Sequence, residues 1–105
     1  RHDAPLVLVC GVLATKDVRA FLAHFTDLAN RVVAVPVSGD HYGRTPADVA
    51  GAARDLGLFA SEAPTIEDAL RQIAAAHWRT PPRILICGSL YLAGAALTLN
   101  GDEPA

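Results

Sequence analysis

The apolar residues of the chain are concentrated in four short runs, at residues 6–10, 32–37, 58–60 and 84–87. Successive runs lie about 26 residues apart, close to the length of one strand followed by one crossover helix. Three of the runs are almost continuous in Val, Ile and Leu, whereas a strand with one solvated face alternates apolar and polar residues. The runs therefore predict parallel strands that are buried on both faces.

The segment after the first run has helical periodicity. Thr15 is a suitable N-cap, and Asn30 is a suitable left-handed residue to end the helix. The apolar positions between them recur at intervals of three and four residues, at Val18, Phe21, Leu22, Phe25 and Leu28. We therefore expect one amphipathic helix to fill most of this segment.

Two further helices have explicit start signals. Thr45 precedes a proline and an acidic residue in the first turn, and Gly57 is placed to end that helix. Thr65 is expected to cap the next helix, whose inward positions are expected to be Ile66, Leu70, Ile73 and Ala74. Trp78 is expected to seal the core where this helix ends, and a fourth helix is expected after Ser89.

This alternation of strands and helices predicts an α/β domain over residues 1–105. The expected architecture is a Rossmann-like open parallel sheet of about four strands with helices on both faces. The pattern does not determine the order of the strands within the sheet.

Composition supports a packed core and excludes some partners. The chain is 51% hydrophobic and only 19% charged, so it can bury a core. Its net charge is −2 and it has no basic run, so we expect neither nucleic acid nor an anionic membrane as a partner. The apolar runs are far shorter than the roughly 20 residues that span a bilayer. We expect a cytoplasmic protein that, lacking any methionine, is part of a longer polypeptide.

The two cysteines, Cys10 and Cys87, each end an apolar run. Two cysteines in a chain with this much core do not form a disulfide scaffold, so both are expected to be buried free thiols. Neither has an adjacent base, which argues against a thiol nucleophile.

Candidate ligand-binding residues follow the strands, because ligands in open parallel sheets bind beyond the carboxyl ends of the strands. Lys16 and Asp17 follow the first strand, and His41 and Arg44 belong to the polar loop after the second. Ser89 follows the fourth strand, where backbone N–H groups at a helix start suit an anion. Each group also has a simpler interpretation, as solvated charges, an ordinary polar loop and a helix cap.

Several enzyme motifs are missing from the sequence. No Gly-x-Gly-x-x-Gly segment follows a strand, and no Gly-x-x-x-x-Gly-Lys-Ser/Thr phosphate loop is present. No Cys or His spacing indicates a zinc site. The residues alone therefore predict an α/β domain with a polar edge, without a catalytic residue or a metal ligand.

Two segments resemble a known family. Residues 8–18, L-V-C-G-V-L-A-T-K-D-V, resemble the F-G-M-L-A-D-K-D-V turn of folylpolyglutamate synthases, and residues 84–94, I-L-I-C-G-S-L-Y-L-A-G, resemble their V-L-V-C-G-S-L-Y-L-x-G segment. The resemblance covers about residues 5–101 and indicates the C-terminal domain of a bifunctional folylpolyglutamate synthase/dihydrofolate synthase of the Mur ligase superfamily. Thr15 and Val12 differ from the residues usual in that family, Asp and Met.

The resemblance implies an ATP-dependent ligase that adds L-glutamate to dihydropteroate or folates through an acyl phosphate, with ATP and Mg as cofactors. In that family the phosphate loop lies in an N-terminal ATPase domain, which this chain lacks, so that domain of the same polypeptide is the implied partner. The chain alone is expected to be inactive. The resemblance also implies that this chain lacks the first strand and helix of the family's C-terminal domain, with their Asp-x-x-His-Asn-Pro segment.

By position in the family motifs, Ser89 is expected near the incoming glutamate. Lys16 and Asp17 are expected to border the interdomain cleft, with His41 and Arg44 along its rim. If the family's first strand lies between the two cysteine strands, their Cα atoms are too far apart for a disulfide.

A stand-alone binding module with a flavodoxin-like or receiver-like fold is the alternative. A receiver needs an acidic pair after its first strand and an aspartate at the end of its third. Cys10 and Gly11 occupy the first place, and Ala60 and Ser61 occupy the second, which disfavours this alternative.

Overall fold

The computed structural model describes residues 4–14, 16–37 and 43–88. Within them the chain forms β1 (Leu6–Gly11), α1 (Val18–Ala23), β2 (Arg31–Ala34), α2 (Pro46–Asp55), β3 (Phe59–Glu62), α3 (Ile66–Ala75) and β4 (Arg83–Gly88). All strand pairs are parallel. The α/β class and the four parallel strands expected from the sequence are confirmed.

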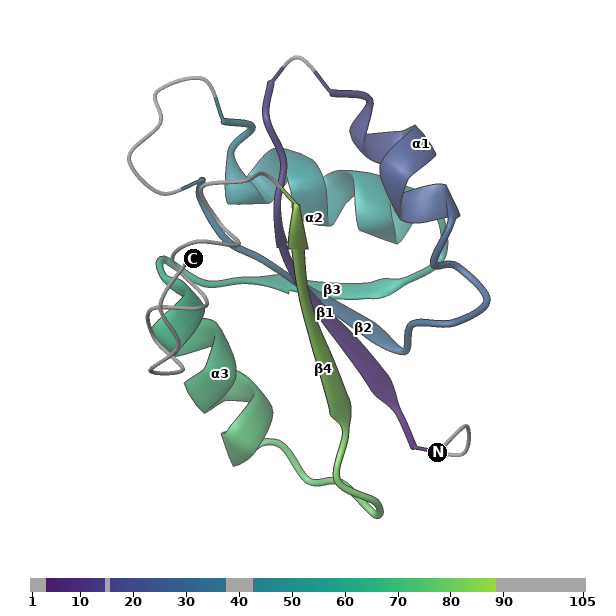
Figure 1. The fold of residues 1–105 in the computed structure, drawn as a ribbon, viewed down its shortest axis with the longest axis vertical. Coiled ribbons are helices and arrows are strands. Elements are labelled where there is room, and N and C mark those ends of the chain that lie inside the picture. The colour runs from purple at the N-terminus through teal and green to yellow at the C-terminus, as the bar shows by residue number, and fades with distance from the viewer. Residues whose placement is uncertain (1–3, 15, 38–42, 89–105) are drawn as a thin grey trace, which may run out of the picture.

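The strands are arranged in the order β3-β2-β1-β4. The chain builds outward from β1 to β2 and β3, and then returns past β1 to place β4 on its other side. Figure 1 shows α1 and α2 on one face of the sheet and α3 on the other. Helices therefore cover both faces, as the Rossmann-like pattern predicts.

The central strand β1 supplies side chains to two separate cores. Leu8 and Cys10 pack with residues of α1 and α2, whereas Val7 and Val9 pack against residues of α3. All four are fully buried, with 0% of each residue exposed. A continuous apolar run is what a strand covered on both faces requires.

Helix α1 starts later and ends earlier than the sequence indicates. Its N-cap is Asp17, whose Oδ1 accepts a hydrogen bond of 3.1 Å from the backbone N–H of Ala20, so the expected cap at Thr15 is wrong. The helix ends at Ala23, and Leu28 beyond it is 61% exposed instead of facing the core.

Asn30 connects the end of this segment to the sheet. Its side-chain Oδ1 accepts from the backbone N–H of Leu6, and its own N–H donates to the Leu6 carbonyl, both at 2.8 Å. The left-handed conformation expected for Asn30 is wrong, because no described residue other than glycine has a positive φ. The residue satisfies the first backbone groups of β1 instead.

The start signals of α2 and α3 are confirmed. The hydroxyl of Thr45 accepts from the backbone N–H of Asp48 at 3.1 Å, and that of Thr65 accepts from the N–H of Asp68 at 3.0 Å. Helix α3 buries Ile66, Ala69 and Ile73, with Leu70 partly buried. Ala74 is exposed, so its expected inward position is wrong.

The two cysteines lie closer together than expected. Strand β4 pairs directly with β1, and Cys10 and Cys87 are Cα partners in that ladder. The expectation that a strand separates them is therefore wrong. Both thiols are free, but Cys87 is only partly buried.

None of the helices in the described ranges has the length and hydropathy needed to cross a membrane.

Two glycines of the described chain allow a matched test of how backbone conformation affects stability. Gly51 lies within α2 and Gly57 has a φ of +86°, and a Cβ at either position meets nothing within 4 Å. We expect Gly51→Ala to stabilise the chain by about 1 kcal/mol, because alanine is the better helix former. Gly57→Ala should destabilise it by about 1–2 kcal/mol, because a left-handed conformation is unfavourable for alanine. Urea unfolding of both variants measures the difference, and two shifts of the same sign would contradict it.

Candidate functional site

The strand order identifies one end of the sheet as the place for a ligand. Strands β1 and β4 are neighbours, yet the chain continues from β1 to α1 on one face and reaches β4 from α3 on the other. In open α/β sheets, ligands bind at such a switch point, outside the carboxyl ends of the strands. Gly11 and Gly88 are Cα partners, so the two strands end side by side. The two strand ends therefore lie together at this edge of the sheet.

The turn after β1 presents Lys16 and Asp17. The backbone N–H of Lys16 donates to the carbonyl of Leu13 at 3.0 Å, which closes the turn. Both residues are exposed, and Asp17 uses a carboxylate oxygen to cap α1. Among the described residues, no ion pair involves Lys16, which is the only lysine of the chain. Its exposed side chain places a positive charge at this end of the sheet.

Arg44 holds this turn in place. Its Nε and NH2 atoms donate to the carbonyl oxygen of Lys16, at 3.1 and 2.8 Å, across a separation of 28 residues. Its backbone N–H also donates to the carbonyl of Val12 at 2.8 Å. The sequence indicates Arg44 as a ligand at the rim, whereas the structure shows its guanidinium bound to the backbone beside Lys16.

Gly43 permits this contact. It forms an isolated antiparallel bridge with Leu13, directly before Arg44. A Cβ added to Gly43 would lie 2.9 Å from the Cβ of Val37, which is too close for any other residue without a shift of the backbone. This role of Gly43 was not predicted from the sequence, although a glycine beside an arginine just before a helix cap is visible there.

The structure does not describe the remaining candidate residues. His41 and Ser89 lie outside the described ranges, as does the helix expected after Ser89. Their assignments stay predictions. In the described part of the chain, no group of three or more His, Cys, Asp or Glu side chains could hold a metal ion.

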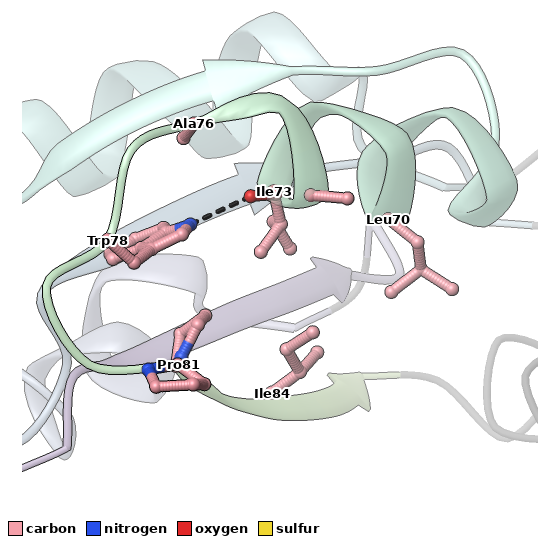
Figure 2. Close-up of a pocket in the computed structure, with 8 residues that line it drawn as sticks. Leu70, Ile73, Ala76, Trp78, Pro81 and Ile84 are labelled. Carbon is pink, nitrogen blue, oxygen red and sulfur yellow. Dashed lines mark hydrogen bonds between the residues drawn. The ribbon is translucent and has the colours of Figure 1, made fainter.

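An apolar groove lies elsewhere, between α3 and the amino end of β4 (Figure 2). Its walls include Leu70, Ile73, Trp78, Pro81, Pro82 and Ile84. The indole N–H of Trp78 donates to the carbonyl of Ile73 at 2.7 Å, and the guanidinium of Arg31 lies 5.1 Å from the ring centroid. Trp78 packs against the α3-side core, as expected. Since Ile84 is near the start of β4 and Gly88 is its end, the groove is separate from the switch point.

Comparison with known proteins gives matches among solved structures. No family model matches the chain, and neither does any curated protein sequence. Folylpolyglutamate synthase from Mycobacterium tuberculosis, complexed with ADP and AMPPCP, is 31% identical with a TM-score of 0.78, over 96% of this chain and 24% of that one. A bifunctional folylpolyglutamate synthase/dihydrofolate synthase from Yersinia pestis, complexed with AMPPNP and a Mn ion, is 21% identical with a TM-score of 0.74, over 94% of this chain and 23% of that one.

The chain therefore spans about a quarter of the length of the synthases that it matches, at 24% and 23%. These likenesses confirm the family resemblance that the two motifs indicate. They also confirm the Rossmann-like fold expected for the C-terminal domain of a ligase in the Mur superfamily.

The contact between Arg44 and the turn can be tested on the isolated chain. We expect Arg44→Ala to speed amide hydrogen exchange at residues 16–20 by about tenfold, because two hydrogen bonds from a charged group are lost and such bonds contribute about 1.5–3 kcal/mol when well formed. Arg54→Ala is the matched control, since Arg54 donates to the carbonyl of Ala60 at 3.0 Å, away from the turn. Equal exchange at residues 16–20 in both variants would show that Arg44 does not hold the turn.

Proposed function

We propose that this chain is part of an ATP-dependent ligase that adds L-glutamate to dihydropteroate or a folate, and that its switch-point end forms the glutamate side of the interdomain cleft. The observation that carries the proposal is the side-by-side ending of β1 and β4, the two strands that bear the family motifs. The likeness to folylpolyglutamate synthases bound to ADP and ATP analogues supports the proposal.

The chemistry of the proposed reaction defines what this end of the sheet must do. The carboxylate of the pteroate or folate takes the γ-phosphoryl group of ATP, and the amino group of glutamate then displaces phosphate from the acyl phosphate. The enzyme must hold the carboxylates of glutamate and orient its neutral amine. Cationic, hydroxyl and backbone N–H donors are suited to the carboxylates.

Each candidate residue has a distinct part in this proposal. The ammonium group of Lys16 binds a glutamate carboxylate, and the hydroxyl of Ser89 donates to the same substrate from the neighbouring strand end. Asp17 borders the cleft and fixes the start of α1. Arg44 positions Lys16 by donating to the carbonyl oxygen of Lys16. His41 lines the rim of the cleft with Arg44.

ATP and its metal ion are assigned to an N-terminal ATPase domain of the same polypeptide. The ion would neutralise charge on the transferring phosphoryl group. The described residues do not fit a metal site of their own, since they bring together no group of three potential ligands. The steps assigned to this chain are therefore the binding and orientation of glutamate.

The purified chain by itself should neither bind ATP tightly nor form folate–glutamate bonds, because its 105 residues contain no phosphate loop. Calorimetric titration with ATP and incorporation of labelled glutamate measure the two properties. The full-length parent polypeptide is the positive control, and ligation by the chain alone would contradict the prediction.

Replacing Ser89 tests the glutamate side of the cleft in the full-length parent. We expect Ser89→Ala to lower kcat/KM for glutamate by about ten- to a hundredfold and to leave the KM for ATP unchanged, because a hydroxyl bound to a carboxylate contributes about 1.5–3 kcal/mol. Steady-state kinetics with each substrate varied in turn measure both effects.

Two comparisons separate this role from a structural one. If Ser89 only caps a helix, alanine costs about 1 kcal/mol of stability and leaves glutamate kinetics unchanged. Ser61→Ala is the matched control, since the Ser61 hydroxyl donates to the side chain of Gln72 at 3.1 Å, on β3. A lower melting temperature with wild-type glutamate kinetics in Ser89→Ala would refute the assignment.

A further inference from the structure

The proximity of Cys10 and Cys87 is a feature that the proposed ligase chemistry does not use. The two residues are Cα partners in the parallel ladder between β1 and β4. Both side chains belong to the core on the α1 and α2 face of the sheet. Neighbouring strands lie about 4.8 Å apart, which is inside the range of about 4.4–6.8 Å found between the Cα atoms of disulfides. The expected Cα separation of the pair is therefore compatible with a disulfide.

The two thiols differ in their access to solvent. Cys10 lies on the central strand and is 0% exposed, whereas Cys87 is only partly buried. Among the described strands, β4 forms one edge of the sheet and β1 lies inside it. Cys87 is therefore the more exposed thiol of the pair within the described part of the chain.

The electrostatics of the pair make the same thiol the more reactive one. The neighbouring thiol of Cys10 lowers the pKa of Cys87, against the opposing effect of burial. The proximity of Cys87 and burial raise the pKa of Cys10. Since the thiolate is the nucleophilic form, Cys87 is the attacking group and Cys10 remains a protonated neighbour.

We propose that Cys10 and Cys87 form a dithiol modification site that reacts with a small peroxide and closes to an intramolecular disulfide. In the first step the Cys87 thiolate attacks one peroxide oxygen and the O–O bond breaks. Hydroxide departs, and Cys87 becomes a sulfenic acid. In the second step the Cys10 sulfur attacks the Cys87 sulfur, the S–O bond breaks, and the departing hydroxide takes up the Cys10 proton to leave as water. With hydrogen peroxide, two thiols are oxidised and one peroxide is reduced to two waters, because the hydroxide of the first step takes up the proton that Cys87 lost when it became a thiolate.

The resulting bond should be easily reduced. Side chains of directly paired residues in a parallel ladder project in nearly the same direction, so the two sulfur atoms must turn toward each other to bond. A disulfide that departs from ideal geometry stores strain and is more reducible. A reversible thiol modification is therefore expected, in contrast to a permanent structural bridge.

Intact-mass spectrometry of the purified full chain tests the site directly. After exposure to hydrogen peroxide and alkylation of the remaining thiols, we expect the protein to lose the mass of two hydrogen atoms and to take up no alkyl group. Dithiothreitol should restore both alkylation sites. In the untreated native chain, Cys87 should be alkylated at least about tenfold faster than Cys10, a difference that unfolding in urea abolishes.

Single replacements identify the order of the steps. With Cys10→Ala, peroxide should add oxygen to Cys87 without forming an internal bridge, and with Cys87→Ala it should leave Cys10 unmodified. Peptide mapping of the oxidised wild-type chain gives the same information if a variant does not fold. Oxygen addition at Cys87 of the wild type without a bridge, or bridges only between separate chains, would overturn the proposal. None of these results depends on whether the parent ligates glutamate.

Discussion

Strand β1 is hydrogen-bonded along both of its edges, to β2 on one side and to β4 on the other. Its side chains also enter both cores, as do those of its neighbour β2, so the helices of the two faces pack against the same interior strands. A cavity created in such a strand is costly, because neighbouring groups on both sides are fixed and can collapse only in part. The end of β1 also begins the turn that carries Lys16. The position of the candidate site is therefore set by an interior strand that is paired on both edges and covered on both faces.

Local signals in the sequence predicted the elements but not their arrangement. The caps at Thr45 and Thr65 were predicted correctly, because each makes its hydrogen bond to a backbone N–H three residues away. Thr15 and Asp17 are both good caps by residue type, and the choice between them depends on a turn that Arg44 holds from 28 residues away. No local sequence pattern indicates the order of the strands. The direct pairing of Cys10 with Cys87 depends on that order, so it could not be predicted either.

The candidate site was predicted as a set of residues and not as a geometry. Placing ligands after the carboxyl ends of strands selected Lys16, Asp17 and Arg44, of which Arg44 contacts the backbone of Lys16, and their roles toward a ligand stay predictions. The role of Arg44 could not be predicted, because its partner is a backbone carbonyl, and every residue has one. The close approach of Gly43 to Val37 likewise depends on packing between segments that have no complementary sequence pattern.

The placement of β4 beside β1 has a consequence for synthesis of the chain on the ribosome. Strands β1, β2 and β3 emerge in the order in which they pair, but the other edge of β1 receives its partner last. Residues 79 apart in sequence, Arg83 and Ala4, are joined where β4 begins. Until β4 is made, the other described strands leave this edge of β1 without a partner, and an unpaired apolar edge is a template for pairing with other chains. Among the described strands, the one that completes the candidate site thus also covers this edge.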